Sequence, residues 1–258
     1  MDSTNQQLLP LNIEIIGEGF PLVLLHGLGS SSKDWQFNVD ALKKRYRLVM
    51  VDLPGHGQSR PAKDGLSITL IADLIISTLD EVGISKFHLL GLSLGGAVAY
   101  QLCLDHPDKV GRVIIVNAIP NYRLTNPTLI IQYILRSVLL NVLGMDAIAK
   151  IVSKKLFPNE DQTSLREYGY QQIRKASKKS YLKTMKALVQ WSIEPQLSRI
   201  NTPLLYIVSE HDSLANSYKD IVDKTKPNST IHVISNAHHA VNIEYPEKFN
   251  KAVLDFLT

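Results

Sequence analysis

The chain has 258 residues and a formal net charge of +4, with 45% hydrophobic and 20% charged residues. These values are ordinary for one globular α/β domain and argue against a disordered chain. The net charge is too small to indicate a nucleic-acid partner. The first ten residues lack the basic start and apolar core of a signal peptide, and the single cysteine, Cys103, cannot form an internal disulfide. We therefore expect a cytoplasmic protein.

Short apolar runs rich in β-branched residues alternate with amphipathic stretches along most of the chain. This alternation predicts an α/β fold in which helices flank a mostly parallel sheet of roughly eight strands. Gly17 and Gly19 separate the first two runs, which predicts a hairpin there. The expected strands are residues 11–16, 20–25, 46–52, 86–92, 110–117, 203–208 and 230–235. The expected helices are residues 69–82, 93–105, 215–225 and 246–257.

No strand signal occurs between residues 119 and 201, where the pattern turns helical. We predict an α/β core at 1–118 and 202–258, with an all-helical cap at 119–201. The cap is basic, because residues 121–200 hold 13 Lys/Arg against 5 Asp/Glu, a net charge of +8. The predicted cap helices are residues 129–143, 146–156, 163–176 and 179–191.

The first cap helix is very apolar but contains Gln132, Arg136 and Asn141. It is therefore too short and too polar to span a bilayer, and we expect no membrane span.

The segment Gly91-Leu92-Ser93-Leu94-Gly95 joins a predicted strand directly to a predicted helix. A serine on such a tight turn has a strained backbone and needs small neighbours two residues to either side, which the two glycines provide. The turn also places the hydroxyl at a helix N-terminus, where amide groups stabilise negative charge on a substrate oxygen. A glycine-rich turn without chemistry is the alternative. The strand and the helix on its flanks favour a nucleophile at Ser93.

The segments HGLGSSSKDW from His26, DLPGHGQS from Asp52, GLSLGG from Gly91 and the C-terminal blocks resemble the α/β-hydrolase superfamily over nearly the whole chain. The resemblance implies the triad order serine, acid, histidine. It also implies structural roles for His26, Asp52 and His56.

In proteins of this fold, two backbone N–H groups bind the oxygen of the substrate carbonyl as it becomes negative. The resemblance places this oxyanion hole at Leu28, in the glycine-rich loop after an early strand, and at Leu94, which follows the serine. Both groups belong to the backbone, so their side chains need not be polar.

An activated serine needs an imidazole to take its proton and a carboxylate to hold that imidazole. The resemblance assigns the carboxylate to Asp212, which follows a late predicted strand, with Glu210 as the substitute. A solvated turn is the alternative role for Asp212. The other acid position of the family holds Asn117, which cannot serve as a carboxylate.

Two adjacent histidines compete for the role of general base. The C-terminal block resembles the family's G-A-G-H segment followed by a Pro-Glu helix start, and counting back from Pro246-Glu247 places His239 in register with the base. His238 then stands where relatives have glycine. We therefore predict a triad of Ser93, Asp212 and His239.

A serine at this turn with two backbone donors suits acyl transfer to water, so we expect a serine carboxylesterase acting on a small-molecule ester. Thioesters, lactones and carbon–carbon bonds are alternative targets of the same triad, and a non-catalytic ligand-binding protein is the alternative from another class. The triad requires no cofactor and no metal, and we expect neither. The residues assigned to substrate binding are Leu28, Trp35, Tyr122 and Trp191.

The basic excess of the cap has two interpretations. A solvated helix face is the simpler one. The chain also resembles small capped esterases that remove a methyl group from a carrier-protein-bound pimeloyl ester, which implies an acidic acyl carrier protein as a partner. The residues concerned are Arg166, Arg174, Lys175, Lys178, Lys179, Lys183 and Lys186.

Overall fold

The computed structural model describes residues 11–62, 65–125, 127–225 and 228–258. The N-terminal segment on which the signal-peptide argument rests, residues 1–10, lies outside the described residues. Within the described ranges, no helix is long and apolar enough to cross a bilayer.

Seven strands of the described residues form one sheet in the spatial order β1-β3-β2-β4-β5-β6-β7. β1 pairs with β3 in antiparallel orientation, and all the other neighbouring strands are parallel. The predicted α/β fold is confirmed, with seven strands instead of roughly eight. The strands are β1 (Ile13–Ile16), β2 (Phe20–Leu25), β3 (Tyr46–Val51), β4 (Phe87–Leu92), β5 (Val110–Val116), β6 (Leu204–Ser209) and β7 (Ser229–Ile234).

The predicted hairpin of the first two strands is wrong. The chain does reverse at Gly17 and Gly19, whose φ angles are 86° and 98°, but β1 pairs with β3 instead of β2. β2 has β3 on one edge and β4 on the other, both parallel to it. Because both edges of β2 are occupied, β1 adds to the outer edge of β3.

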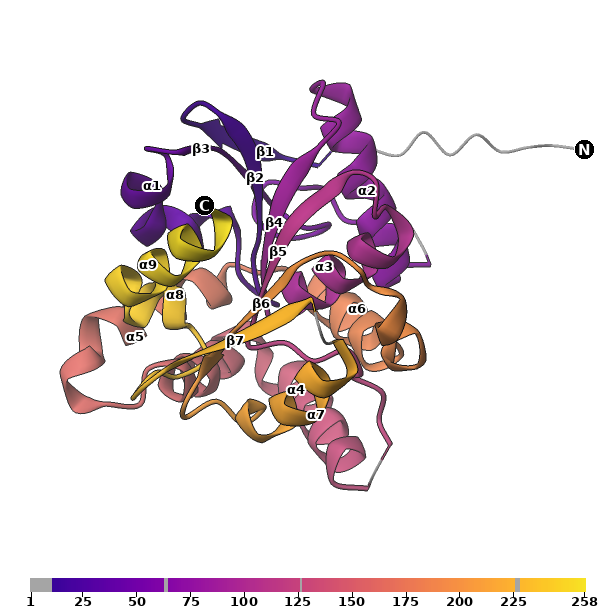
Figure 1. Ribbon diagram of the computed structural model, residues 1–258. Helices are drawn as coiled ribbons and strands as arrows, with labels where there is room; N and C mark the ends of the chain where they lie inside the picture. Colours follow the sequence, from indigo (N-terminus) through magenta and orange to yellow (C-terminus); the bar gives the residue numbers. More distant parts are fainter. Residues whose placement is uncertain (1–10, 63–64, 126, 226–227) are drawn as a thin grey trace, which may run out of the picture.

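Helices cover both faces of the sheet (Figure 1). α2 and α3 lie on one side of the strands, and α1 and α9 lie on the other. The short α1 and α8 were absent from the predicted helices. The helices of the core are α1 (Gln36–Leu42), α2 (Ile68–Glu81), α3 (Leu94–Asp105), α7 (Tyr218–Thr225), α8 (Val241–Glu244) and α9 (Pro246–Leu257).

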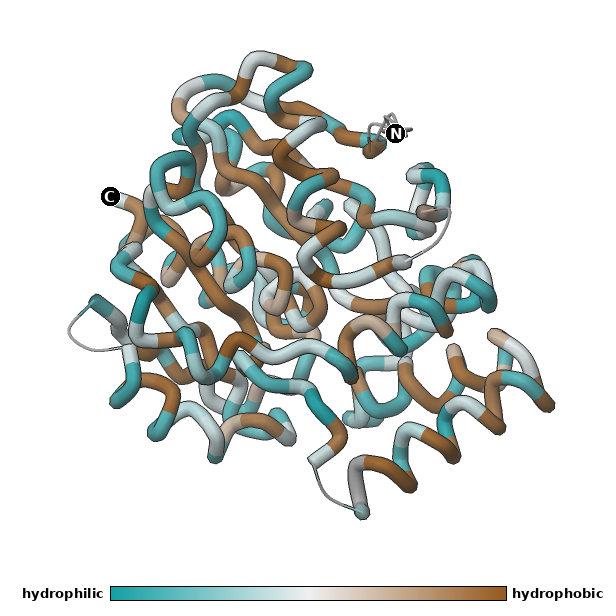
Figure 2. The backbone as a smooth tube through the Cα atoms, turned by 90° about the vertical axis from the view of Figure 1, so that its right-hand side faces the viewer, coloured by the Kyte–Doolittle hydropathy of each residue, from teal (hydrophilic) through white to brown (hydrophobic). Residues whose placement is uncertain are grey.

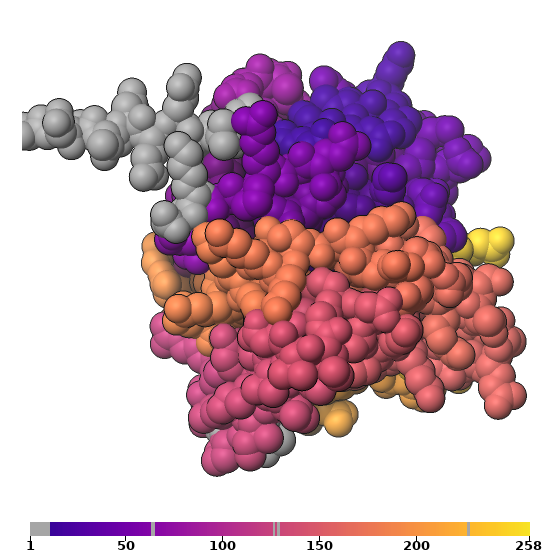
Figure 3. Space-filling model, turned by 180° about the vertical axis from the view of Figure 1, so that it is seen from behind, coloured from indigo at the N-terminus to yellow at the C-terminus, as the bar shows by residue number. Residues whose placement is uncertain are grey.

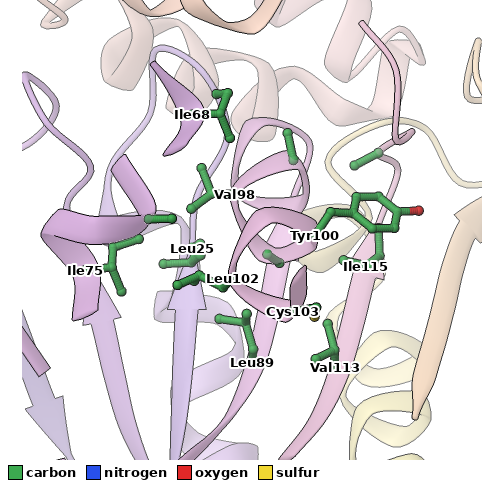
Figure 4. Close-up of a cluster of buried hydrophobic side chains, with 14 of the residues drawn as sticks. Leu25, Ile68, Ile75, Leu89, Val98, Tyr100, Leu102, Cys103, Val113 and Ile115 are labelled. Carbon is green, nitrogen blue, oxygen red and sulfur yellow. The ribbon is translucent and has the colours of Figure 1, made fainter. Parts of the chain in front are cut away.

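Alternate residues of the central strands point to opposite faces of the sheet and divide the core into two layers. Val23 and Leu25 of β2 enter the layer beneath α2 and α3, whereas Leu22 and Leu24 enter the layer beneath α1 and α9. Figure 4 shows part of the first layer, which includes Cys103. Burial raises the pKa of the Cys103 thiol to about 12, as suits a core residue.

Three helices occupy the chain between β5 and β6, where the sequence predicted a helical cap: α4 (Pro127–Leu156), α5 (Thr163–Arg174) and α6 (Lys178–Val189). Figure 3 shows these segments side by side, next to the first part of the chain. Gly144 interrupts α4 with φ 77° and ψ −173°, so the two helices predicted there form the two halves of α4. The boundaries of the cap as a domain stay a prediction.

An apolar cluster attaches the cap to the core. Leu140 of α4 and Tyr181 and Met185 of α6 are buried together, and Leu28 of the core packs against them. The inner face of the cap thus lies on the loop that follows β2.

Asp34 links this loop to α5 and α8 through polar contacts. Its carboxyl group accepts hydrogen bonds from the hydroxyls of Ser30 and Tyr168, the latter at 3.2 Å, and its carbonyl accepts one from Asn242 at 3.1 Å. Burial raises the pKa of the Asp34 carboxyl group from 3.8 to about 6, because the hydrogen bonds only partly compensate for the lost solvation.

We expect Asp34 to make the folded protein less stable as pH rises from 3.8 to about 6. The folded state holds this proton more tightly than the unfolded state, so the stabilisation is complete below the lower value and lost above the higher one. A shift of about 2 pKa units corresponds to about 3 kcal/mol. Asp34→Asn stays neutral, so its free energy of unfolding relative to wild type should rise by about that amount across this interval.

Chemical denaturation across the same pH interval measures the effect. Asp255→Asn is the matched control, because Asp255 is 62% exposed in an ion pair with Lys251. If Asp34→Asn follows wild type in parallel at every pH, the prediction is wrong.

Candidate active site

A strained turn between β4 and α3 presents Ser93. Its φ of 54° and ψ of −111° fall in a region that residues with a side chain rarely adopt. A side chain at Gly91 would collide with the backbone of Gly95, and one at Gly95 would collide with the carbonyl of Leu25. Both glycines are therefore required by the close approach of strand, turn and helix, as the sequence predicted.

The loop after β2 lies beside this serine. A Cβ atom built on Gly27 would lie 3.7 Å from the Cβ atom of Ser93. Leu94 begins α3, and the Ala97 N–H donates to the Ser93 carbonyl at 3.0 Å. Because the N–H groups of a first helical turn have no acceptor within their helix, the Leu94 N–H is available to a ligand. The oxyanion hole at Leu28 and Leu94 stays a prediction that this arrangement supports.

His26 and Asp52 hold neighbouring loops together. The Nδ1–H of His26 donates to the Gly27 carbonyl at 2.8 Å, and its Nε2 accepts from the Leu53 N–H at 3.0 Å. Burial and the adjacent His56 imidazole lower the pKa of His26 to about 3, so this ring stays neutral. Asp52 accepts two backbone N–H bonds, at 2.8 and 2.9 Å. These contacts agree with the structural roles expected for both residues.

Asp212 and His239 form a direct pair at the carboxyl ends of the strands. His239 Nδ1 lies 2.5 Å from Asp212 Oδ2, and the other carboxylate oxygen accepts from the Leu214 N–H at 2.8 Å. Burial opposes ionisation of Asp212, but hydrogen bonding and the charge of His239 outweigh it and lower the pKa of Asp212. The His239 side chain is 30% exposed and that of Asp212 only 2%. An imidazole open to a ligand is thus oriented by a buried carboxylate.

His238 has a different partner from His239. Its Nδ1 and its backbone N–H contact the two oxygens of Glu244 at 2.8 and 2.6 Å. Glu244 Oε1 also accepts from the amide of Gln162, which lies just before α5 of the cap, at 2.6 Å. His238 therefore belongs to a contact between core and cap, and the choice of His239 as base is consistent with this division.

Asn117, at the end of β5, fastens the loops that carry the acid and the base. Its amide nitrogen donates to the Ser209 hydroxyl at 2.7 Å and to the His239 carbonyl at 2.9 Å, and its amide oxygen accepts from the Ser209 N–H at 2.9 Å. The preceding carbonyl, on Val116, accepts from the Ser93 N–H at 2.9 Å. Two consecutive residues therefore hold the loops of the serine and the histidine.

The residues predicted to bind substrate occupy different environments. Trp35 has no exposed surface and packs against Phe249 in the layer beneath α1 and α9. We therefore reassign Trp35 to the core, because its side chain offers no surface to a ligand.

The rings of Tyr122 and Trp191 are tilted by 35° with their centroids 6.2 Å apart, and the indole N–H of Trp191 donates to the Gln101 side chain at 2.7 Å. Burial, with a contribution from the negative charge of Asp212, raises the pKa of Tyr122. Tyr122 and the half-buried Leu28 stay candidates for the walls of the site, as does Trp191, although it is only 8% exposed.

Sequence reasoning missed the positioning roles of Asn117 and Glu244. Asn117 was considered only as a missing acid, although an asparagine at a strand end readily adopts the φ of 45° found here. Nothing in the sequence marked Glu244, whose partners come from two separate segments. Within the described ranges, no three His, Cys, Asp or Glu side chains are grouped as metal ligands would be.

The chain matches the sequence profile described as alpha/beta hydrolase fold over residues 21–246. It is 29% identical over 259 residues to the pimeloyl-[acyl-carrier protein] methyl ester esterase of Aeromonas hydrophila, covering 96% of this chain and 100% of that protein. It is 28% identical over 244 residues to a protein of Caulobacter sp. strain K31 provisionally named carbamate hydrolase RutD, covering 92% and 90%. Among solved structures, the enol-lactonase of Burkholderia xenovorans LB400 has a TM-score of 0.87 at 26% identity over 96% of both chains.

We expect His239→Ala to lower kcat for a p-nitrophenyl ester by about a thousandfold or more, because no other imidazole pairs with Asp212 among the contacts described. His238→Gly should retain kcat within about tenfold, since the backbone N–H to Glu244 remains. A larger loss in the His238 variant than in the His239 variant would reverse the assignment.

We expect Asn117→Ala to lower the free energy of unfolding by about 2 kcal/mol and kcat by about 10- to 100-fold, because it frees the His239 loop. Thr78→Ala is the control. Thr78 is also buried, and its hydroxyl makes two hydrogen bonds, to Leu11 and Leu74, against three for the Asn117 amide, but it lies on α2. Equal losses of kcat in both variants, at matched losses of stability, would refute the positioning role of Asn117.

Proposed function

The chain belongs to the α/β-hydrolase fold family, and from this premise we propose that it is a serine hydrolase that cleaves a carboxylic ester through an acyl-enzyme. The observation that carries the proposal is the buried Asp212 paired with the accessible His239, at the strand ends that also hold Ser93. Ser93 is the proposed nucleophile, His239 the base and Asp212 the acid. Hydrolases among the relatives support this class of reaction.

In the proposed first step, the Ser93 hydroxyl oxygen attacks the carbonyl carbon of the ester. The His239 Nδ1–H donates to Asp212, so the lone pair on Nε2 is the one that takes the serine proton. The carbonyl oxygen becomes negative and is stabilised by the backbone N–H groups of Leu28 and Leu94. Nε2 then gives its proton to the departing alkoxide, which leaves as the alcohol.

The second step repeats this exchange with water. His239 removes a proton from a water molecule, which attacks the acyl carbon, and the returned proton restores the Ser93 hydroxyl as the acid departs. The buried Asp212 stays ionised because its pKa is lowered, and it stabilises the imidazolium in both steps. The sequence of proton transfers requires only side chains and backbone groups of this chain.

The type of acyl bond is a finer proposal. An ester is the leading substrate class, and the same triad would open a lactone or cleave a thioester, a carbamate or a carbon–carbon bond. The structural neighbour is an enol-lactonase and one relative is provisionally a carbamate hydrolase. The catalytic groups do not distinguish these carbonyl compounds, because all present a similar tetrahedral oxyanion.

A second candidate is a methyl ester carried on an acyl carrier protein. It is favoured by the basic cap, with 13 Lys/Arg against 5 Asp/Glu over residues 121–200, and by the relative that acts as a pimeloyl-[acyl-carrier protein] methyl ester esterase. Arg166 is less available to an acidic partner than this count of basic residues implies, because its guanidinium donates to the carbonyls of Phe157 and Asn159 at 2.9 and 2.8 Å.

A fluorophosphonate probe tests the proposed nucleophile. Wild type should become labelled at Ser93, and Ser93→Ala should not, because only an activated serine reacts at an appreciable rate. Ser153→Ala, which removes a buried serine of α4, is the control and should label like wild type. Absence of labelling in wild type would favour the non-catalytic ligand-binding protein.

The substrate class is tested by comparing kcat/KM across p-nitrophenyl esters of increasing chain length, a lactone, a carbamate, an acyl-thioester and a carrier-linked methyl ester. The highest value on a simple ester supports the leading proposal. A higher value on one of the other compounds reassigns the class without changing the triad.

A further inference from the structure

The first half of α4, from Pro127 to Leu143, exposes an unusual amount of apolar surface. Seven aliphatic residues in this half are at least 40% exposed, and the same degree of exposure is uncommon for aliphatic side chains elsewhere in the described chain. Large contiguous apolar patches on a protein surface generally mark a contact with another molecule. The residues are Ile130, Ile131, Ile134, Leu135, Val138, Val142 and Leu143.

Five of these residues, Ile131, Ile134, Leu135, Val138 and Val142, lie on one side of the helix, which we call the outer face of α4, and Ile130 and Leu143 lie beyond its two edges. Positions 131, 135, 138 and 142 follow the three-or-four-residue spacing of a helix face, and Ile131 and Val142 are 62% and 73% exposed. The opposite side is already occupied, because Leu140 is buried against α6. Figure 2 shows this helix at the margin of the molecule, with mostly brown residues.

Positive charge borders the outer face. Residues 127–145 contain no acidic residue. Lys178 of α6 donates to the carbonyl of Asn141 at 3.1 Å, so the basic start of α6 lies against the end of this half-helix. Lys179, the next residue of α6, is exposed. Asp146, the nearest acid along the helix, is paired with Lys150 at 2.8 Å.

This combination argues against a second copy of the chain as the occupant. A two-fold dimer through the outer face would bring the same basic border of both copies together, and like charges across an interface are unfavourable. The face also lacks the aromatic and methionine side chains that usually anchor protein partners. Among residues 130–143, which the structure describes, Gln132 and Asn141 are the polar residues classed as exposed.

We propose that the outer face of α4 binds an anionic lipid surface. The aliphatic side chains enter the headgroup region, which needs no fixed hydrogen-bonding pattern, while the bordering lysines contact lipid phosphates. The helix lies in the plane of the surface. This proposal does not depend on the chemistry at Ser93.

The position of the outer face gives the contact a consequence for the cap. The buried side of the same half-helix packs with Tyr181 and Met185, and this cluster contacts Leu28 beside the serine turn. A lipid surface bound to the outer face would therefore contact the same half-helix whose buried side belongs to the cluster that reaches Leu28 of the predicted oxyanion loop.

Sedimentation with vesicles tests the proposal directly. Vesicles of phosphatidylcholine with about one-third phosphatidylserine should bind wild type, and vesicles of phosphatidylcholine alone should bind it more weakly. Ile131→Gln/Val142→Gln should lower the partition coefficient by at least about tenfold, because two aliphatic side chains no longer enter the lipid. Lys178→Glu/Lys179→Glu, at the start of α6, should lower only the component that depends on phosphatidylserine and that salt removes.

The matched control is Ile231→Gln/Val233→Gln on β7, where the two side chains are 45% and 52% exposed. It should change the partition coefficient by less than about twofold. The proposal is overturned if wild type does not bind anionic vesicles, or if the control loses as much binding. It is also overturned if Ile131→Gln/Val142→Gln dissociates a dimer of wild type instead of lowering vesicle binding. The same holds if wild type binds no vesicles and this variant abolishes binding to an acidic carrier protein. Fluorophosphonate labelling is measured separately, so failure here leaves the nucleophile unaffected.

Discussion

The buried amide of Asn117 is the constraint on which the arrangement of the candidate site depends. Parallel strands bring their carboxyl ends to one edge of the sheet, but they do not by themselves hold the loops that leave that edge. Asn117 does so with three hydrogen bonds, two to Ser209 and one to the His239 carbonyl. The Ser93 N–H is bound by the adjacent carbonyl. Asn117 thus holds the loop of Asp212 through Ser209, at the end of β6, and holds His239 through its backbone carbonyl.

Much of this architecture was readable in the sequence because it depends on local patterns. The strand of β4, the glycines around Ser93 and the start of α3 are each encoded within a few residues, so the turn was predicted closely. Partners distant in sequence were not predictable in the same way. The placement of β3 between β1 and β2 overturned the hairpin, because strand neighbours are chosen by the whole sheet. Burial likewise moved Trp35 from the predicted site to the core.

The cap and the core meet through polar as well as apolar contacts. Asp34 binds Tyr168 of α5, and Glu244 binds Gln162 just before that helix. Both carboxyl groups are held by side chains from the two parts of the chain, so these contacts specify how the cap sits beside the His239 loop. The apolar cluster at Leu28 also holds the cap on the core, but burial of apolar surface is less directional than these hydrogen bonds. Residue pairs of this kind are expected to set the orientation of the cap.

The backbone of Ser93 has a consequence for how this protein tolerates change. A residue held at φ 54° and ψ −111° costs about 1 to 3 kcal/mol, which the two hydrophobic layers must outweigh. This is a sizeable share of the about 5 to 15 kcal/mol by which most domains remain folded. Mutations that loosen the core around β4 and α3 therefore lower a free energy of unfolding that the strained turn has already reduced. Because glycine adopts this conformation without strain, replacing Ser93 by glycine should leave more stability in reserve for other destabilising mutations.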